Sequence, residues 1–499
     1  MTRRRVTIAL AAIFGLGLAL RVLALWIEPP HHPDEFFQYL EPAWRHLTGA
    51  GVETWEWRAG IRSWALPGYH GAWMALAMKL GVRDGLAIGT FLRAHWALLS
   101  LTLVWAGWRG GLLLTRRSLA RKVLPTASTS SLGSDVPPMG WQGGLLAALL
   151  CAIFPLLVRF SIHTLSELPS ILCMVWALVL TGELVEDPGP SPRKKAMWTG
   201  FLIGLGVCLR IQHAPVALVI AIWLLVARRA RLLPYVVLLS LLPVALFGGI
   251  DWATWGTPFS SFIAYVKFNV LQSGADIFGK LPPSWYATTF FHRLPVGLGV
   301  LGLLCILGLR SGWPFVASAL GLAALLSTQA HKEERFAMLC WPLLLIPAAG
   351  LVGAWWATQK ARADAAEPGK RPRLRIWIAR AATALFVVVV LGDAALHARG
   401  NDFADLSPDR FRAQIWAGRQ SDITGLLYDE PLFTGGYMWF SRPFPQVMWK
   451  PTLLHNPLFS HVLAPRHSGL SLAAERAGFV EVFSAGNFAI LRRRAVATP

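Results

Sequence analysis

Long apolar stretches, repeated along almost the whole chain, are the feature that most restricts how this sequence can fold. A helix needs about 20 apolar residues to cross roughly 30 Å of hydrocarbon. Stretches of that order recur in eleven places among the 499 residues: 6–27, 86–108, 141–160, 167–184, 198–212, 213–227, 233–251, 294–309, 313–328, 336–357 and 376–397. Hydrophobic residues make up 55% of the chain and charged residues only 15%, which excludes a soluble globular protein. The sequence therefore predicts a polytopic α-helical membrane protein with about 11 transmembrane helices.

Basic residues orient these spans, because short loops rich in Lys and Arg stay in the cytoplasm. The arginines at 3–5 place the N-terminus inside, and eleven alternating spans then bring every strongly basic run to that side: 116–122, 193–195, 228–231 and 370–375. The apolar stretch 66–82 would break this parity if it crossed, so we expect an interfacial or re-entrant piece. The loop 28–65, with six acids and three arginines, falls outside together with the tail after 397.

The expected domains follow from this topology. Residues 1–397 should form a transmembrane domain with an outer-face loop over 28–85, and 398–499 an extracytoplasmic domain. Strand-like runs near 424–428, 447–449, 478–483 and 488–492 are separated by Gly, Pro and Asn, which is typical of a small mixed α/β domain. Its role is either acceptor recognition or a structural cap.

The formal net charge of +20 could indicate binding to nucleic acid or attraction to anionic lipid headgroups. Because the basic runs lie at predicted inner helix ends, the second interpretation is preferred. Membrane lipids, and no nucleic acid, are the expected partners.

The first outer loop concentrates acidic residues just beyond a hydrophobic span, where a carboxylate without a partner is costly. Pro33 suits the first turn of a helix, and four polar side chains would then share one helix face: Asp34, Gln38, Glu41 and Arg45. This pattern predicts an amphipathic helix on the membrane surface, which Pro42 should kink or end within about a turn. A plain interfacial helix with Trp55, Trp57 and Trp64 as an aromatic belt is the structural alternative.

A second outer cluster, 331–335, reads His-Lys-Glu-Glu-Arg between two spans. Its three potentially cationic groups could bind a phosphate, whereas the simpler interpretation is a solvated charge run in a loop. A metal site built from His31, His32, Asp34 and Glu35 is conceivable. We expect none, because adjacent residues at a helix start point in different directions.

Several of these motifs, in this chain order, resemble those of glycosyltransferase family 22, the polytopic mannosyltransferases of GPI-anchor and N-glycan assembly. The resemblance covers about residues 6–357 and rests on these motifs: His32-Pro33-Asp34-Glu35 with Gln38 and Glu41, Thr54-Trp55-Glu56-Trp57, Ile61-Arg62-Ser63, Thr164-Leu165-Ser166, Asp251 with Trp255-Gly256, Trp285-Tyr286, and the six residues His331 to Phe336. The sequence departs from the family at His163, usually Arg, at Glu167, usually Asn, and at Arg210-Ile-Gln-His, usually Arg-Pro-Thr. Its high Ala, Leu, Arg and Gly content suggests a bacterial member.

The resemblance implies a GT-C glycosyltransferase fold and inverting transfer of a hexose, with mannose as the first choice. The donor would be a polyprenyl or dolichyl phosphate sugar, and the acceptor a glycan or glycolipid. It implies Asp34 as the general base and a set of substrate-binding residues, with no metal and no cofactor: Glu35, Gln38, Trp55, Trp57, Arg62, His331, Lys332 and Arg335.

The chemistry of the residues agrees with this expectation. A lipid phosphate is a good leaving group that needs cations, whereas the acceptor hydroxyl needs a base, so one carboxylate suffices instead of the two of glycosidases. The site should lie on the extracytoplasmic face, which is periplasmic in a bacterium or luminal in the endoplasmic reticulum.

A membrane transporter or flippase of a lipid or glycan intermediate is the alternative. It would place its charges near the middle of the bilayer, with internal repeats, which the sequence does not show.

Overall fold

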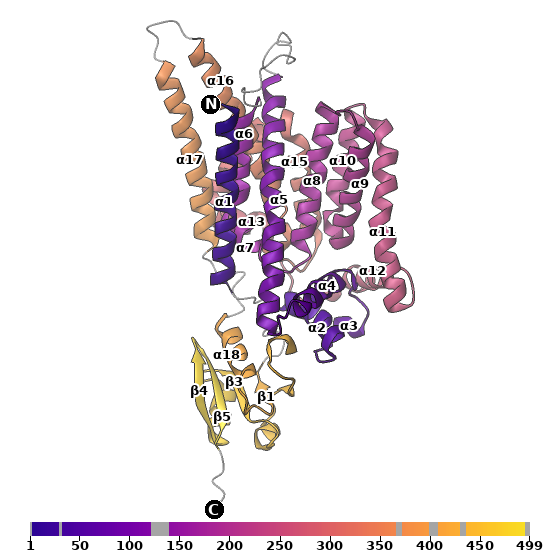
Figure 1. The fold of residues 1–499 in the computed structure, drawn as a ribbon, viewed down its shortest axis with the longest axis vertical. Coiled ribbons are helices and arrows are strands. Elements are labelled where there is room, and N and C mark those ends of the chain that lie inside the picture. Colours follow the sequence, from indigo (N-terminus) through magenta and orange to yellow (C-terminus); the bar gives the residue numbers. More distant parts are fainter. Residues whose placement is uncertain are drawn as a thin grey trace, which may run out of the picture.

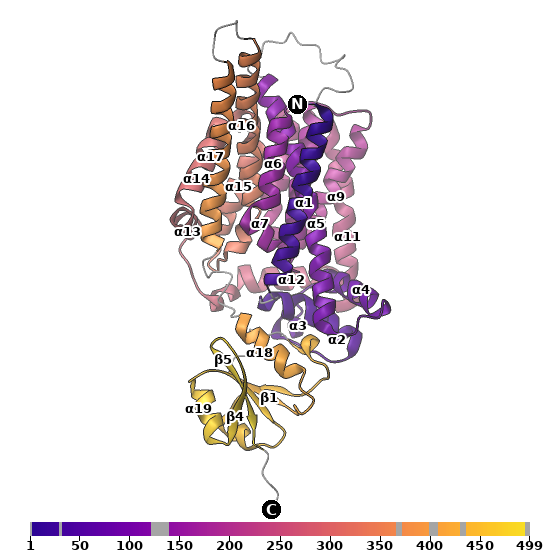
Figure 2. The same ribbon diagram turned by 60° about the vertical axis from the view of Figure 1, so that its left-hand side comes forward.

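The computed structural model describes residues 2–28, 32–120, 139–365, 372–398, 408–429 and 436–494. A bundle of long helices forms most of the molecule, and a small sheet domain lies at one of its ends (Figure 1). The N-terminus lies at the opposite end of the bundle in both ribbon views (Figure 2). His31, one of the residues weighed for a metal site, lies outside the described residues.

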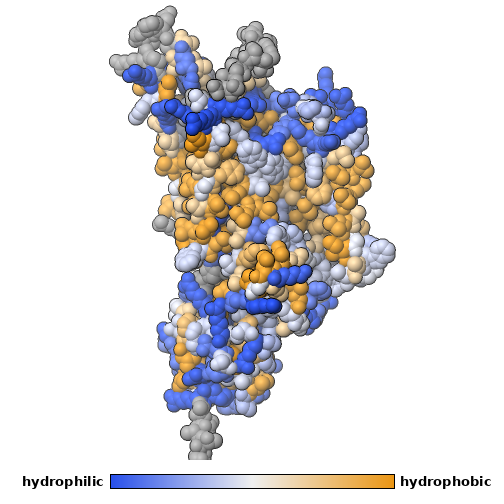
Figure 3. Space-filling model, viewed as in Figure 1, coloured by the Kyte–Doolittle hydropathy of each residue, from blue (hydrophilic) through white to orange (hydrophobic). Residues whose placement is uncertain are grey.

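Each of the eleven predicted spans coincides with helix. The helices are α1 (Arg3–Ile27), α5 (Gly85–Ala120), α6 (Trp141–Ile153) followed by α7 (Pro155–Phe160), α8 (Glu167–Glu186), α9 (Pro192–Leu209), α10 (Ala214–Val226), α11 (Leu233–Trp255), α14 (Pro295–Leu307), α15 (Leu309–Thr328), α16 (Cys340–Asp364) and α17 (Pro372–Ala398). Among the described residues, seven helices are long and apolar enough to cross a membrane, or eight if the bent pair ending in α14 is one span. An apolar band covers the middle of the bundle on the face shown in Figure 3, between more hydrophilic ends. The chain is thus a multi-pass membrane protein, whereas the count of eleven crossings and their orientation stay predictions.

Small residues let the central helices of the bundle touch at their backbones. A Cβ on Gly111 of α5 would lie 2.3 Å from the carbonyl oxygen of Gly143 of α6, and one on Gly353 of α16 would lie 2.3 Å from the amide nitrogen of Gly143. The hydroxyl of Thr115 donates across the same contact to the carbonyl of Gly350, at 3.1 Å. Close approach of this kind replaces the hydrophobic driving force that is missing between helices in lipid.

Four short helices form a layer between the bundle and the sheet domain: η1 (Glu35–Leu40), α2 (Glu41–Thr48), α3 (Trp55–Arg58) and α4 (Ala65–Lys79). The helix α4 falls within the apolar stretch 66–82, is 15 residues long and lies at the end of the bundle instead of running through it (Figure 1). This placement agrees with the interfacial piece expected there. A second set of short helices follows α11 on the chain: α12 (Ser260–Val266), η4 (Lys267–Leu271), η5 (Gly274–Phe278) and α13 (Trp285–Arg293).

The prediction of an amphipathic helix on the membrane surface is wrong for residues 35–43. The segment 35–40 is a π-helix, whose i→i+5 hydrogen bonds change the residues per turn and so break the 3.6-residue polar face. Both the polar and the apolar side chains of this segment are buried: Glu35, Phe36, Phe37, Gln38, Leu40 and Glu41. Pro42 does not end a helix but lies in the first turn of α2, where a missing N–H costs no hydrogen bond.

The C-terminal domain has a five-stranded sheet in the order β2-β1-β3-β5-β4. Its elements are α18 (Pro408–Gly418), β1 (Leu426–Tyr428), β2 (Gln446–Met448), β3 (His461–Pro465), α19 (Gly469–Arg476), β4 (Phe479–Ala485) and β5 (Phe488–Arg493). Pairing is parallel from β2 through β1 to β3 and antiparallel from β3 through β5 to β4. The expected α/β character is confirmed, but the central strand β3 was not predicted.

The sheet domain shares a hydrophobic core with the layer of short helices. The ring of Phe36 stacks on Phe411 at 5.8 Å between centroids and meets Trp439 edge-on at 5.3 Å. A Cβ on Gly85, at the start of α5, would lie 1.7 Å from the carbonyl oxygen of Met438. A structural cap requires such a shared core, and the role in acceptor recognition stays a prediction.

A buried carboxylate ties the two parts together as well. Glu41 accepts hydrogen bonds from the backbone N–H groups of Tyr437 at 2.7 Å, Val52 at 2.9 Å and Met438 at 3.5 Å. The approach is so close that a Cβ on Gly436 would lie 1.9 Å from a carboxylate oxygen of Glu41. Glycine is therefore required at position 436 for this contact.

Candidate active site

The two charged clusters singled out in the sequence meet at the end of the bundle that faces the sheet domain. Asp34 immediately precedes η1, and Arg335 lies in η6 (Glu334–Ala337), the short turn before α16. An Nη2 donor of Arg335 lies 2.5 Å from Oδ2 of Asp34, although the two residues are 301 positions apart in the chain. The fold therefore brings together two distant segments into a site that neither segment has alone.

Arg335 is surrounded by carboxylates. Its Nε lies 2.5 Å from Oε2 of Glu333, and its Nη1 lies 3.4 Å from Oε1 of Glu167 at the start of α8. The same oxygen of Glu167 lies 2.7 Å from Nη1 of Arg210, at the end of α9. Both guanidinium groups also lie over the ring of Phe336, at 5.1 and 4.6 Å from its centroid.

This arrangement keeps the carboxyl groups of Asp34 and Glu333 ionised. Burial alone would raise the pKa of Asp34, but the guanidinium of Arg335, assisted by His32, lowers it below the ordinary value. The pKa of Glu333 is likewise well below its ordinary value in spite of burial, because Arg335 and hydrogen bonds from His32 and His331 favour the anion. Asp34 is still 28% exposed, whereas Arg335 is 5% exposed. Asp34 and Glu333, which is 29% exposed, are therefore accessible to a ligand, whereas Arg335 lies beneath them.

Two histidines complete the cluster on the side of Glu333. The Nε2 atom of His331 lies 2.9 Å from Oε1 of Glu333, and that of His32 lies 3.6 Å from Oε2. The backbone N–H of Asp34 donates to Nδ1 of His32 at 3.1 Å, which assigns the ring proton of neutral His32 to Nε2. Lys332 does not join them, because its ammonium group donates to the carbonyl of Gln329 and its side chain is buried.

Glu35, adjacent to Asp34, points away from this cluster. Its carboxylate lies 2.9 Å from Nδ1 of His163 and accepts the backbone N–H of Thr164 at 2.7 Å, and it is fully buried. The structure thus gives Glu35 a positioning contact that fixes the first loop against the turn before α8.

The remaining predicted site residues have other partners. Trp57 donates its Nε1 proton to the carbonyl of Phe37 at 2.9 Å, and Arg62 pairs with Glu56. Arg62 is close enough to contribute to the lowered pKa of Asp34. The ring of Trp55 lies 5.0 Å from that of Phe268. Gln38, in η1, is buried.

Sequence reasoning missed Glu167 and Arg210 as members of the cluster. Both were noted only as departures from the family pattern, yet Glu167 pairs with Arg335 and is itself paired with Arg210. Ionisable residues at the ends of apolar spans are a signal for such a role, because they persist there only with a partner or a function.

Comparison with known proteins gives one family. The family model described as the Alg9-like mannosyltransferase family matches residues 12–401. Among curated proteins, GPI mannosyltransferase 3 of Yarrowia lipolytica is 29% identical over 327 residues, covering 64% of this chain and 57% of that protein. Mannosyltransferase APTG1 of Arabidopsis thaliana is 26% identical over 349 residues, covering 67% and 57%. The chain thus spans less than two-thirds of the length of these relatives.

Solved structures support the fold. ArnT from Cupriavidus metallidurans, bound to undecaprenyl phosphate, aligns with a TM-score of 0.60 at 13% identity, covering 98% of this chain and 99% of that chain. The archaeal oligosaccharyltransferase AglB from Archaeoglobus fulgidus, in complex with an inhibitory peptide and a dolichol-phosphate, aligns with a TM-score of 0.53 at 10% identity, covering 99% and 75%. The expected GT-C fold is confirmed. A bacterial origin stays a prediction.

Proposed function

Because the chain belongs to the Alg9-like mannosyltransferase family, we propose that it transfers a hexose, mannose in the first instance, from a polyprenyl or dolichyl phosphate to a hydroxyl of a glycan or glycolipid. The similar structures of ArnT and AglB hold undecaprenyl phosphate and dolichol-phosphate, which supports a lipid phosphate as the carrier. The family match does not favour the alternative of a transporter or flippase.

The observation that carries this proposal is the Asp34–Arg335 pair. It joins a partly exposed carboxylate to a buried cation at one end of the bundle. Acceptor activation needs a base, and departure of a lipid phosphate needs positive charge. The pair offers both within one contact.

In the proposed reaction the acceptor hydroxyl oxygen attacks the anomeric carbon of the donor while its proton passes to Asp34. The bond between the anomeric carbon and the phosphate oxygen breaks with inversion, and its electrons leave on the lipid phosphate, which gains one negative charge. Asp34 acts as general base, and Glu35 keeps the first loop in register through His163.

Arg335 and His331 are the proposed ligands of the donor phosphate. The guanidinium of Arg335 is engaged by Asp34, Glu333 and Glu167, so a phosphate must exchange with one of them. Exchange with Asp34 would release that carboxylate and raise its pKa, making it a stronger base. Donor binding would thereby activate the base. Lys332 reaches a phosphate only if it leaves the carbonyl of Gln329.

The test is transfer of radiolabelled mannose from a polyprenyl phosphate mannose by purified membranes that contain the chain. Asp34→Asn keeps the shape of the side chain and removes its basicity, so we expect the rate to fall by about 10²–10⁴-fold. Asp364→Asn, an exposed residue at the far end of α16, is the control and should leave the rate unchanged. A near wild-type rate for Asp34→Asn would refute the assignment.

Arg335→Ala separates the donor from the acceptor. Loss of the guanidinium should raise the half-saturating concentration of the lipid phosphate mannose more than that of the acceptor. A rise confined to the acceptor would contradict the role proposed for Arg335.

A further inference from the structure

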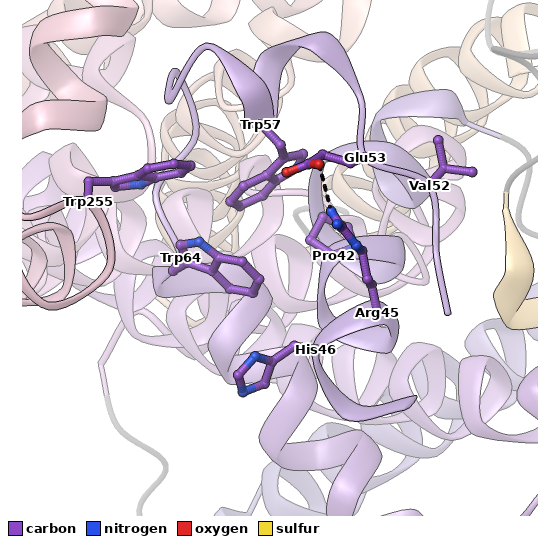
Figure 4. Close-up of a pocket in the computed structure, with 8 residues that line it drawn as sticks. All are labelled: Pro42, Arg45, His46, Val52, Glu53, Trp57, Trp64 and Trp255. Carbon is purple, nitrogen blue, oxygen red and sulfur yellow. Dashed lines mark ion pairs between the residues drawn. The ribbon is translucent and has the colours of Figure 1, made fainter. Parts of the chain in front are cut away.

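A pocket of about 430 Å³ lies between the layer of short helices and the end of α11, and none of its lining residues belongs to the Asp34 cluster. We call it the indole pocket; its walls include Arg45, His46, Glu53, Trp57, Trp64 and Trp255. Figure 4 shows the three indole rings on one side of the pocket and Arg45 with Glu53 on the other. One wall is thus aromatic and the other is charged.

The aromatic wall is continuous. The rings of Trp57 and Trp64 lie 4.8 Å apart between centroids, and those of Trp57 and Trp255 lie 6.2 Å apart at 22°. Trp57 is buried, whereas Trp64 and Trp255 are partly exposed. Trp57 therefore supports the other two rings, and Trp64, which also meets the ring of His46 at 5.7 Å between centroids, keeps part of its surface exposed toward the pocket.

The charged wall is an open ion pair. Nη1 of Arg45 lies 3.1 Å from Oε2 of Glu53, and both side chains are more than 40% exposed. Gly51 permits this pair, because a Cβ there would lie 2.5 Å from the Cβ of Arg45 and would push the loop off α2. Such an exposed pair contributes about 0–1 kcal/mol to stability. Its donors and acceptor oxygens can therefore be shared with a hydroxylated ligand at little cost.

We propose that the indole pocket binds one neutral hexose ring of the acceptor glycan, with the ring face on Trp64 and the hydroxyls on Arg45 and Glu53. A pyranose has C–H groups on its face and hydroxyls around its edge, which matches an aromatic wall opposite a polar one. One positive and one negative side chain favour a neutral ligand, because a phosphate would meet the carboxylate of Glu53. A lipid acyl chain would remove water from the Arg45–Glu53 ion pair without offering hydrogen bonds to replace it.

The pocket is attached to the site of the proposed chemistry through its own tryptophans. Trp57 donates to the carbonyl of Phe37, and Trp255 donates to the carbonyl of Arg62 at 3.1 Å. Both carbonyls belong to the segments that flank Asp34. The sugar in the pocket is then a unit of the acceptor other than the one that reacts, so this inference rests on the proposed function and specifies its acceptor.

Trp64→Ala is the informative variant, because replacing Trp57 or Trp255 would also remove a hydrogen bond that holds the backbone beside Asp34. Trp252→Ala is the matched control, since Trp252 lies one turn before Trp255 on α11 and is 65% exposed. Glu53→Gln keeps the shape of the charged wall and removes its charge, which allows a conclusion even if Trp64→Ala fails to fold.

The experiment is saturation-transfer NMR on the full chain in detergent, with methyl α-mannopyranoside and an α-linked mannobiose as probes. The wild type and Trp252→Ala should give equal signals. Trp64→Ala should bind about tenfold more weakly, and Glu53→Gln should also lose signal. Equal binding by the wild type, Trp64→Ala and Glu53→Gln would overturn the inference. A second result would also overturn it: mannoside binding lost in Trp64→Ala but not in Glu53→Gln, together with a weaker saturation-transfer signal from the acyl chains of the detergent. That result would identify an acyl-chain site.

The transfer assay keeps this result separate from the proposed function. Asp34→Asn should abolish mannose transfer and leave mannoside binding intact. If Asp34→Asn abolishes mannose transfer but mannoside binding is unchanged in Trp64→Ala and Glu53→Gln, the inference about the indole pocket is wrong and the proposed reaction is still supported. Normal transfer by Asp34→Asn would remove the proposed base, while binding that depends on Trp64 and Glu53 would still support the pocket.

Discussion

Asp34 and Glu41 lie seven residues apart on the same outer loop, yet their surroundings give them opposite properties. Asp34 faces Arg335, which lowers its pKa. Burial dominates at Glu41, where no cation among the described residues offsets it, so its pKa rises from 4.5 to about 7 in spite of three backbone hydrogen bonds. Two carboxylates of one segment can thus serve different ends: one is held ionised at the proposed site until it accepts a proton, and the other anchors the sheet domain.

The largest difference between the two should appear in catalysis. Asp34→Asn should reduce mannose transfer by about 10²–10⁴-fold, whereas Glu41→Gln, which lies outside the Asp34 cluster, should change it only a few-fold. Initial rates at equal amounts of membrane protein measure both. If Glu41→Gln lost as much activity as Asp34→Asn, the division between a site and an anchor would be wrong.

The next largest difference between Glu41 and Asp34 should be in how the stability of the protein depends on pH. A carboxyl whose pKa is raised on folding binds a proton in the folded state that the unfolded state has already lost, so its contribution falls as pH rises. For Glu41 the window runs from 4.5 to about 7, and the loss is on the order of 3 kcal/mol across it. Thermal unfolding in detergent should therefore give a higher Tm at pH 5 than at pH 8.

Glu41→Gln isolates this contribution from those of other titrating groups. The difference in Tm between the two pH values should shrink in the variant, because the amide does not titrate. An unchanged difference would show that the carboxyl of Glu41 is not the group responsible. Asp34 should behave oppositely, since a lowered pKa contributes stability above its ordinary pKa and loses it only under acid conditions.

A steric change at the anchor should have a smaller effect. Gly436→Ala would place a Cβ 1.9 Å from the carboxylate of Glu41, and relief of such a clash typically costs about 1–3 kcal/mol. Gly469→Ala is the control, because a Cβ there meets nothing within 4 Å. Limited proteolysis between the helical and sheet domains should accelerate in the first variant and not in the second. Equal proteolysis would argue against close docking at Gly436.

The smallest effect is expected for an exposed ion pair at the edge of the interface between the sheet domain and the helical domain. Arg419 of the sheet domain lies 3.2 Å from Asp84 beside α5, with both side chains about half exposed, so the pair should contribute less than about 1 kcal/mol and weaken with salt. Asp84 also accepts the N–H of Ala87 at 2.9 Å. A double-mutant cycle on Arg419 and Asp84 cancels this second contribution and measures the coupling free energy of the ion pair alone. A coupling well above 1 kcal/mol would mean that docking depends on charge as much as on the apolar core.

The sequence by itself determined the elements that depend on local composition. Apolar length marked the helices, because covering a bilayer needs a fixed number of apolar residues whatever their neighbours are. Alternating strand formers marked β1, β2, β4 and β5, but not β3, whose five residues begin with His461 and end with Pro465. Motif order pointed to the family and to Asp34 and Arg335.

Only the tertiary structure decided what each polar side chain faces. Helical periodicity predicted that Gln38 and Glu41 share a solvent-exposed face with Asp34. The π-helix over 35–40 changes the directions in which these side chains point, and the sheet domain packs over the segment. The pairing of Asp34 with Arg335, and the support of Arg335 by Glu167 and Arg210, join segments far apart in the chain. Such contacts arise from how helices pack, and packing depends on the fit between surfaces of distant segments, which no local pattern records.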